Sequence, residues 1–257
     1  ILIVGHAIGN KHRLPVEEYV QAAEGSKVEV IAQNLGLFMQ GRPWSARMLW
    51  GERDYYSTEM CRATAAAHWR AGADGIYLFN NHLISVARDL AYNRQPWKEI
   101  ADPHLIERLD KHYLVDQPTL GDDPPGCGGR RFSLRHPFIA TLEKPGDEAE
   151  VSVDLADDIA SATRDGAVRN VCLRILVEQF TNLDELEVHV NDTVMPKYES
   201  HTKLLFNDAW IEYEASDVLT QGWNRIRFKV KRRNSMVQCP LSVKSVEILV
   251  NYNDVSL

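Results

Sequence analysis

The sequence predicts an α/β domain followed by an all-β domain. Residues 1–115 alternate apolar runs of strand length with segments of helical period. Residues 131–257 instead contain repeated short runs in which apolar and polar residues alternate. Between them, the stretch "DQPTLGDDPPGCGGR" at residues 116–130 is rich in Pro, Gly and Asp, as linkers are. We therefore predict domains at residues 1–115 and 131–257, joined by a linker at residues 116–130.

The first domain is expected to contain a parallel sheet. Its predicted strands are residues 1–6, 28–36 and 75–80, and its predicted helices are residues 15–25, 58–72 and 104–115. Pro15 suits the first turn of the first helix and Gly25 its end, and Ser57 is a favourable N-cap for the second. Strands that alternate with helices in this way are typical of a parallel sheet with right-handed crossovers. Three strands form either a small open sheet or the last part of an eight-stranded barrel. We predict the C-terminal part of a TIM-like β/α barrel.

The second domain is expected to be an antiparallel β-sandwich or jelly roll. The evidence is a series of short alternating segments separated by turns: "EVSVDL", "VCLRILVEQF", "LEVHVN", "WIEYEA", "NRIRFKVK" and "SVKSVEILVNY". Its aromatic residues Trp210, Tyr213 and Trp223 either form a platform for a sugar or, as is more common in sandwiches, belong to the core. The basic run Lys229, Lys231, Arg232 and Arg233 is interpreted as a solvated strand end.

Composition and charge exclude several classes of partner. The formal net charge of −7 argues against a nucleic-acid partner, which requires a basic face. No apolar stretch approaches the length that spans a bilayer, so no membrane segment is predicted. The four cysteines lack the spacing of zinc ligands, and no nucleotide-binding motif is present, so neither a metal nor another cofactor is predicted. Oligomeric state and cellular location stay open.

Two pairs of segments carry a resemblance to a known family. "HWRAGADGIYLFNN", followed by "LIERLDKHYLV", resembles the end of the barrel in glycosyl-hydrolase-like proteins of the family-ten type. "LEVHVNDTVM" and "YEASDVLTQGWNRIRFKV" look like the jelly-roll, galactose-binding-like modules that accompany glycosidase barrels. The resemblance implies a carbohydrate-active architecture of a barrel end plus an accessory module. Because the sequence opens on Ile1 within an apolar run, we also expect an N-terminal portion to be missing.

Polar side chains follow each predicted strand of the first domain. The chemistry of a β/α barrel lies at the carboxyl ends of its strands. These positions hold amides and imidazoles: His6, Asn10, Gln33, Asn34, Asn80, Asn81 and His82. Such groups suit the hydroxyls of a sugar, which both donate and accept hydrogen bonds. Each of them alone is equally compatible with a turn or a helix cap, but their recurrence at all three strand ends favours a substrate-binding site.

A long loop at residues 37–56 supplies further candidates. Long loops in compact domains tend to be functional. Trp44, Trp50 and Tyr55 offer flat faces for pyranose rings, and Arg42 suits an acidic sugar group. The tryptophans are equally compatible with packing the loop onto the barrel. Glu52 and Asp54 are the candidate catalytic carboxylates, since glycosidases use a pair of them. In an ordinary glycosidase, one or both catalytic carboxylates would then lie on earlier strands that precede this sequence.

These observations predict the C-terminal part of a glycoside-hydrolase-like protein that acts on or binds a glycan. The alternative is a non-catalytic carbohydrate-binding or scaffold protein, which the scarcity of carboxylates at the strand ends would explain. Whether the chain is an enzyme is left open, and the expected partner is a carbohydrate in either case.

Overall fold

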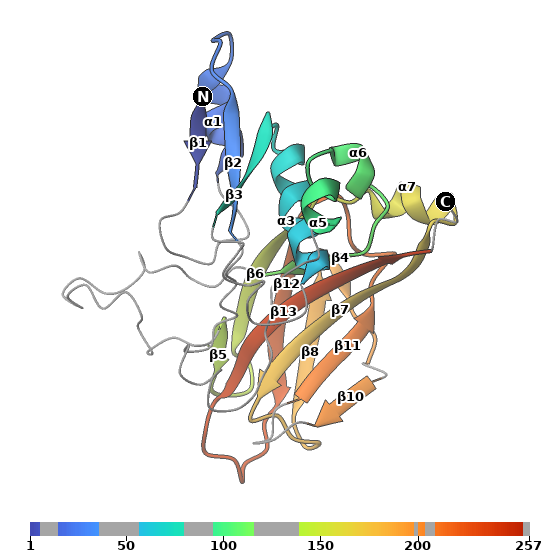
Figure 1. Ribbon diagram of the computed structural model, residues 1–257. Helices are drawn as coiled ribbons and strands as arrows, with labels where there is room; N and C mark the ends of the chain where they lie inside the picture. The colour runs from blue at the N-terminus through green and yellow to red at the C-terminus, as the bar shows by residue number, and fades with distance from the viewer. Residues whose placement is uncertain are drawn as a thin grey trace, which may run out of the picture. The chain divides into compact units, whose positions relative to one another are not determined.

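The computed structural model of the protein describes residues 1–5, 15–35, 57–79, 95–115, 139–197, 200–203 and 209–253. The chain divides into two compact units, Ile1–Ser133 and Leu134–Leu257. Figure 1 shows their helices and strands. Among the described residues, no helix is long and apolar enough to cross a membrane.

The first unit contains a three-stranded parallel sheet. Its strands are β1 (Leu2–Val4), β2 (Val30–Leu35) and β3 (Gly75–Phe79), and they lie in the order β1-β2-β3. Helix α1 (Val16–Ala23) lies between β1 and β2 in the chain, and α3 (Thr58–Arg70) lies between β2 and β3. These five elements fall within the segments predicted for them.

Helix α3 has clear signals at both ends. The hydroxyl of Ser57 accepts a hydrogen bond from the backbone nitrogen of Met60 at 3.2 Å, which caps the first turn. Gly72 follows the last turn with a φ of +89°, a conformation that favours glycine. A Cβ atom at Gly72 would also lie 3.2 Å from Cγ1 of Val20, so a larger residue would crowd helix α1.

The segment after α3 and β3 differs from the prediction. In place of one helix over residues 104–115, the structure has a short helix, α6 (Pro103–Ile106), and a strand, β4 (Lys111–Leu114). Another short helix, α5 (Gln95–Glu99), precedes them. The single predicted helix was wrong. All four residues of β4 are buried, and the Lys111 ammonium donates to the carbonyl oxygens of Glu107 and Leu109, both at 3.1 Å. These bonds satisfy carbonyls left open where α6 ends, so the turn is stable without a continuing helix.

The second unit consists mainly of two antiparallel sheets. One has the order β6-β12-β8-β9, from strands β6 (Glu148–Leu155), β12 (Gly222–Arg232), β8 (Glu185–Val190) and β9 (Thr193–Val194). The other contains, in this order, strands β10 (Ser200–Lys203), β11 (Ala209–Glu214), β7 (Val168–Glu178) and β13 (Leu241–Tyr252). Strand β5 (Ala140–Leu142) pairs with the start of β13, and one short helix, α7 (Ile159–Arg164), precedes β7.

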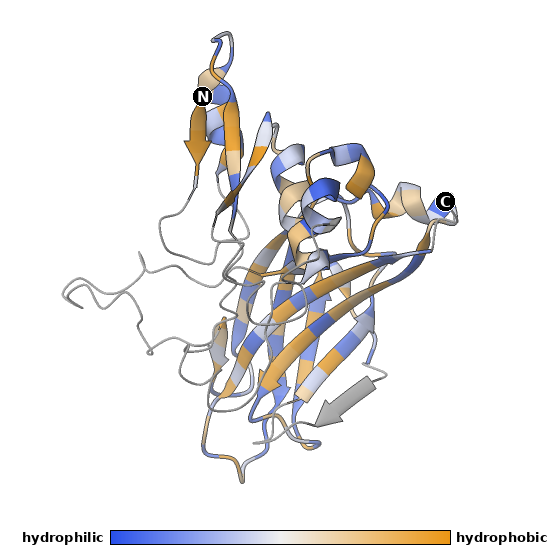
Figure 2. Ribbon diagram, viewed as in Figure 1, coloured by the Kyte–Doolittle hydropathy of each residue, from blue (hydrophilic) through white to orange (hydrophobic). Residues whose placement is uncertain are grey.

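Alternate side chains of both sheets form the core of this unit. Ile226 and Phe228 of β12 are fully buried, as are Leu173 and Ile175 of β7. Figure 2 shows hydrophobic and hydrophilic residues alternating along these strands, the pattern expected of sheets with one face inward. The β-rich, antiparallel part of the predicted fold class is thereby confirmed. The barrel part and the domain bounds stay predictions.

Candidate functional site

The parallel strands of the first unit end at one edge of their sheet. Val4, the last residue of β1, pairs with Ala32 of β2, and Leu35 pairs with Phe79 at the ends of β2 and β3. Parallel neighbours direct their carboxyl ends the same way, so the segments that follow all three strands begin at this edge. Most of the predicted substrate-binding residues belong to those segments.

Both long helices of the first unit cover the same face of the sheet. Val16 of α1 lies in one buried cluster with Val4 and Ala32. Cys61 of α3 lies in a second cluster, against which Ile76 of β3 packs. Ala32 and Ile76 are partners in the register, so their side chains point to the same face. Helices α1 and α3 therefore lie on one side of this sheet.

The opposite face of the sheet is more open. Ile3 pairs with Ile31 across β1 and β2, and Gln33 pairs with Tyr77 across β2 and β3. Ile3 is 54% exposed and Tyr77 is 41% exposed. Within the described part of the chain, neither core cluster of the first unit includes a side chain from this face.

Gln33 is one of two predicted site residues that the structure describes. Its side chain lies against the backbone of Gly5, directly after β1. A Cβ atom at Gly5 would lie 1.9 Å from Oε1 of Gln33, so a larger residue at position 5 would force the Gln33 side chain to move. Gln33 is therefore placed at the carboxyl edge of the sheet on its open face, where a ligand-binding role was predicted.

Asn34, the second described candidate, points the other way. Its side chain is fully buried, and its amide nitrogen donates to the backbone oxygen of Cys61 at 3.2 Å. The same nitrogen lies 3.7 Å from the Cys61 sulfur. This contact joins β2 to α3 within the core. A substrate-binding role for Asn34 stays a prediction.

A buried histidine joins α3 to β2 beside these residues. His68 is 2% exposed, and its Nε2 atom lies 3.1 Å from the backbone oxygen of Gln33. Burial lowers the pKa of His68 from 6.5 to about 4, against smaller opposing effects of the Gln33 carbonyl and the Glu17 charge. The ring is thus neutral at pH 7, and Nε2 carries the proton that it donates to Gln33. His68 has a packing role, which agrees with its position on an alanine-rich helix.

The remaining predicted site residues lie outside the described residues. They are His6, Asn10, Arg42, Trp44, Trp50, Glu52, Asp54, Tyr55, Asn80, Asn81 and His82. Their roles stay predictions.

Two described carboxylates of the first unit have structural partners. Asp74 precedes β3, and its carboxylate accepts the backbone N–H of Val30 at 2.8 Å. This bond lies at the amino ends of β2 and β3, opposite the predicted site. Glu99 accepts Nε of Arg62 at 2.8 Å, with both side chains mostly buried. Among the described residues, no group of three or more His, Cys, Asp and Glu side chains is arranged to hold a metal ion.

In the second unit, the two asparagines of the jelly-roll motif form one buried network. Asn224 is fully buried, and its amide nitrogen donates to the carbonyl oxygens of Thr220 at 2.7 Å and Gly222 at 2.9 Å. Its amide oxygen accepts from the backbone of Thr220 at 2.9 Å and from Asn191 at 3.0 Å. Asn191 also accepts the backbone N–H of Arg225 at 3.0 Å. The hydrogen bonds of these two asparagines thus join two turns to β12.

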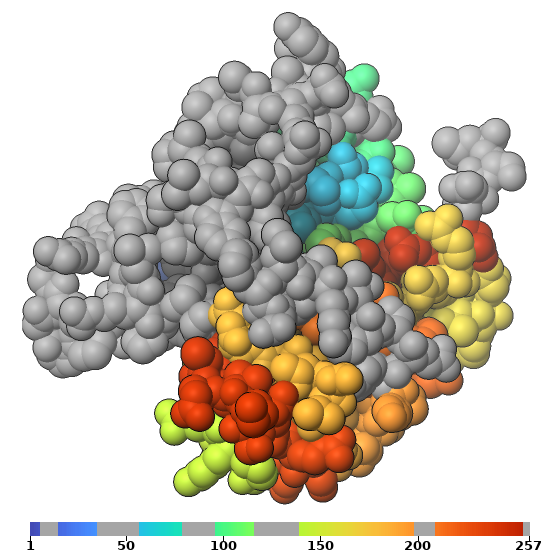
Figure 3. Space-filling view, turned by 90° about the horizontal axis from the view of Figure 1, so that it is seen from below, coloured from blue at the N-terminus to red at the C-terminus, as the bar shows by residue number. Residues whose placement is uncertain are grey.

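A second buried network closes one end of this unit. The Asp184 carboxylate accepts from Nη1 of Arg233 at 2.7 Å, the backbone nitrogen of Asn234 at 2.6 Å, and Thr181. Burial by itself would raise the pKa of Asp184, but these hydrogen bonds outweigh it and hold the pKa below its ordinary value. Figure 3 views the chain from below, where yellow-green, gold and red segments of this unit lie together.

The basic run of β12 is neutralised within the chain. The Lys229 ammonium lies 2.5 Å from Glu148, and that of Lys231 lies 3.3 Å from Glu187. Arg232 donates to the backbone oxygen of residue 183 at 2.9 Å, and Arg233 is the buried partner of Asp184. These residues form a solvated, ion-paired face and its buried end, as the prediction of a strand end implies.

The three aromatic residues of the second unit have different surroundings. Tyr213 is 5% exposed and belongs to the core. Trp210 is partly buried, and the guanidinium of Arg174 lies over its ring at 4.7 Å. Trp223 is 55% exposed, on the outer side of β12. Of the two alternatives open from the sequence, a platform formed by all three does not agree with these positions, because the three side chains do not share a face. The exposed neighbours of Trp223 were not singled out from the sequence, although period-two spacing places Arg225 beside it.

Comparison with known proteins does not assign the chain to a family. No family model matches it, and no curated protein matches it. The resemblance to glycosyl-hydrolase-like proteins of the family-ten type therefore gains no support from sequence.

Two solved structures share a weak likeness. One is a beta-porphyranase of glycoside hydrolase family 86 from the human gut bacterium Bacteroides plebeius, with a TM-score of 0.34 and 8% identity over 57% of this chain. The other is a cycloisomaltooligosaccharide glucanotransferase from Paenibacillus sp., with a TM-score of 0.26 and 10% identity over 90% of this chain. This chain spans 21% and 29% of their respective lengths. Both TM-scores are too low to assign a fold or a function.

Proposed function

We propose that this chain is the C-terminal part of a glycoside-hydrolase-like protein, and that its first unit binds or acts on a glycan at the carboxyl ends of β1, β2 and β3. The second unit would be an accessory jelly-roll module.

One observation carries the barrel part of this proposal. The parallel strands follow one another in the order β1-β2-β3, and α1 and α3 lie on the same face. In a doubly wound sheet, helices cover both faces and the strand order reverses at the ligand site. In a β/α barrel the strands follow in sequence, all helices lie outside, and the other face turns inward. The open face with Ile3, Gln33 and Tyr77 would then be the barrel interior.

The barrel arrangement would bring the predicted polar residues to one mouth. His6 and Asn10 follow β1 in the sequence, Gln33 lies near the end of β2, and Asn80 and His82 follow β3. Amides and imidazoles in such a ring match sugar hydroxyls as both donors and acceptors. The aromatic and arginine residues of the loop at 37–56 would add stacking surfaces and a cationic contact.

The alternative is a carbohydrate-binding protein without catalysis. It is favoured by the fact that Asp74 lies at the amino ends of β2 and β3, away from the predicted site, and that Glu99 is paired with Arg62. Glu52 and Asp54 are then the only candidates for catalysis that we propose within the chain.

Binding measurements on variants test the site. We expect Asn80→Ala and His82→Ala to weaken glycan binding by roughly 0.5–1.5 kcal/mol each, the worth of an ordinary hydrogen bond, and to leave the melting temperature nearly unchanged. Isothermal titration with a glycan found on a screening array gives the affinity. The matched controls Asn170→Ala and His104→Ala change exposed residues of the same types elsewhere and should alter neither quantity. A loss of stability with unchanged affinity would show that Asn80 and His82 are turn residues.

Turnover separates the enzyme from the binder. If the protein hydrolyses the glycan that it binds, Glu52→Gln or Asp54→Asn should lower the rate by about 100-fold or more and retain affinity. A glycan that is bound but never cleaved by the unaltered protein would favour the binding protein.

A further inference from the structure

Two exposed side chains flank a fully buried one on β12. Trp223 and Arg225 are adjacent to Asn224 on either side, and successive residues of a strand point to opposite faces. Asn224 is fully buried, whereas Trp223 is 55% exposed and the side chain of Arg225 is 56% exposed. Trp223 is the one aromatic residue among the exposed large hydrophobic residues of the described second unit.

The backbone beneath these two side chains is held on both sides. Asn191 accepts the N–H of Arg225 at 3.0 Å, and the backbone N–H of Asn191 donates to the carbonyl oxygen of Arg225 at 2.7 Å. Asn224 binds the carbonyl of Gly222, the residue before Trp223, at 2.9 Å. Gln221 donates to the backbone oxygen of Ala156 at 2.7 Å. Trp223 and Arg225 are therefore presented by a rigid backbone, which lowers the entropy cost of binding a ligand.

Both hydrogen-bond donors and hydrogen-bond acceptors surround Trp223 and Arg225. On β6, Asp154 pairs with Trp223 and the exposed Ser152 pairs with Arg225. On the other side, the Asp192 carboxylate lies 3.3 Å from Arg225 and is 96% exposed. The surface thus combines one aromatic side chain with a hydroxyl, a guanidinium and a carboxylate. Hydroxyl-rich ligands need donors and acceptors together, beside an apolar surface for their C–H groups.

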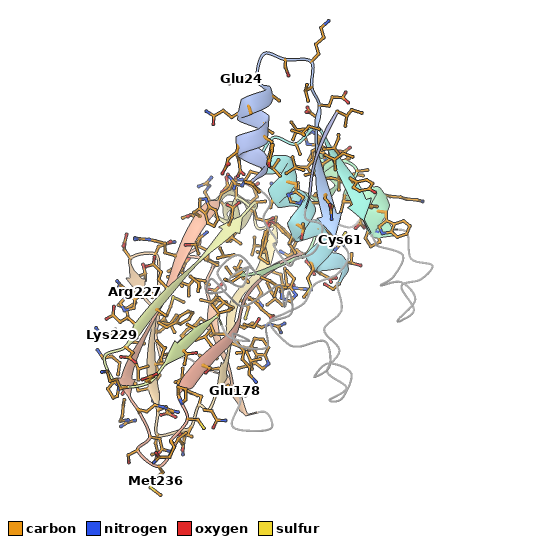
Figure 4. The ribbon with its side chains drawn as sticks, turned by 90° about the vertical axis from the view of Figure 1, so that its left-hand side faces the viewer. Glu24, Cys61, Glu178, Arg227, Lys229 and Met236 are labelled. Atoms are coloured by element: carbon orange, nitrogen blue, oxygen red, sulfur yellow. The ribbon has the colours of Figure 1, made fainter. Side chains whose placement is uncertain are left out.

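Charge balance favours an uncharged ligand. Arg225 is paired with Asp192, and Lys229, farther along the same face, is paired with Glu148. Arg227, between them, lies 3.2 Å from Nδ1 of His189. Figure 4 shows Arg227 and Lys229 on the outer side of this sheet. An anionic ligand would have to displace or approach the carboxylates, so the face offers it little net attraction.

We propose that Trp223, Arg225, Asp192 and Ser152 form a surface binding site for an uncharged pyranoside unit of a glycan. The indole carries the sugar ring, and the polar groups bind its hydroxyls. This site belongs to the second unit alone and goes beyond the strand-end site of the proposed function, on which it does not depend.

Affinity electrophoresis of the whole chain tests the proposal. The probes are gels that contain hydroxyethylcellulose, xyloglucan, dextran or agarose as neutral polymers, and alginate or heparin as acidic ones. We expect at least one neutral polymer to retard the protein, and this retardation should change little in about 0.5 M NaCl. Trp223→Ala should weaken this retardation by about tenfold, as for other central aromatic contacts, and Arg225→Ala by several fold. Both variants should keep the melting temperature, because neither side chain belongs to the core.

Two controls define the outcomes. Met236→Ala changes an 84% exposed residue in the turn between β12 and β13 and should bind like the unaltered protein. Retardation that weakens in Trp223→Ala arises in the second unit, whereas retardation that weakens only in Asn80→Ala and His82→Ala arises at the strand-end site and contradicts the present proposal. The proposal is overturned if no neutral polymer retards the protein, if Trp223→Ala binds as well as the unaltered protein, or if only acidic polymers bind. It is also overturned if Trp223→Ala instead dissociates an oligomer, since the residue would then serve a protein interface.

Discussion

Individual buried polar side chains hold neighbouring elements together in both units. Asn34 and His68 join β2 to α3 in the first unit, and Asp184 joins two loops in the second. Each of them has a hydrogen-bond partner, as burial of a polar group requires. The surroundings of His68 and Asp184 set their protonation states, so a fall in pH should weaken the structure at these two residues.

His68 makes the first unit sensitive to mild acid. Its folded pKa of about 4 lies below the ordinary 6.5, so its contribution to stability is complete above pH 6.5 and is lost as the pH falls towards 4. At about 1.4 kcal/mol for each tenfold change in proton affinity, the loss amounts to about 3 kcal/mol. We expect the hydrogen-exchange protection factors in α3, which are corrected for the intrinsic pH dependence of exchange, to fall over this range.

The variant His68→Gln provides the comparison. It retains a donor for the Gln33 carbonyl but has no titrating ring, so the protection factors in α3 should change much less between pH 6.5 and 4. Equal pH dependence in both proteins would mean that His68 is not the responsible group. The Asp184 carboxyl, whose pKa is lowered, is expected to act only below its ordinary range of about 3.8.

At the scale of elements, strand β12 organises the second unit. It is the strand that pairs with both β6 and β8, and its residue Asn224 binds the turns on each side. The recurrence of Asn and Gly in the jelly-roll motif therefore has a structural cause. The same strand carries Trp223 and Arg225 on its outer face, which links the rigidity of the motif to the proposed sugar site.

Replacement of Asn224 measures the strength of this network. Asn224→Ala should lower the free energy of unfolding by about 3 kcal/mol or more, because several buried backbone groups lose their partner. Asn224→Asp keeps the two accepted bonds but loses both donated ones and buries a charge, so it should also destabilise at neutral pH and recover in part when acid protonates it. Denaturant titration followed by circular dichroism gives both values. A loss below about 1 kcal/mol for Asn224→Ala would show that water replaces the amide.

Strand β4 is an element whose type the local spacing of apolar residues does not predict. Leu105, Leu109 and Tyr113 recur at a spacing of four, which favours a helix. In the structure, the chain turns after Ile106, and all of Lys111–Leu114 is buried as a strand. A helix would bury only one stripe of this segment, and burial of every side chain is a property of strands with both faces covered.

At the scale of the whole molecule, each unit has its own core. Among the described residues, the first has clusters around Val16 and Cys61, and the second has the interior of its two sheets. The composition of residues 116–130 predicts an exposed connection between them.

Limited trypsin digestion tests the domain bounds. Within 116–130 the one trypsin site is Arg130, and we expect the first cut there or at Arg131. Two resistant fragments, near residues 1–130 and 131–257, should then appear in mass spectra. First cuts at the arginines and lysines inside β6, β7 or β12 would contradict these bounds.

The sequence by itself determined the elements whose signals are local. Strands β1, β2 and β3, helices α1 and α3, and the alternating strands of the second unit are all visible as period, caps and turn residues. The recurrence of polar residues after the strands could likewise be found by inspection, although of those candidates only Gln33 and Asn34 are described. Period two also indicates that Trp210 and Tyr213 lie on opposite faces of β11.

Only the tertiary structure decided which face of each element is covered. It turns Asn34 towards α3 while Gln33 beside it lies on the open face, and it buries Tyr213 while Trp223 stays exposed. It also makes Lys111–Leu114 a strand. The physical reason is that burial depends on partners far away in the sequence, such as Cys61 for Asn34, and no local spacing contains that information.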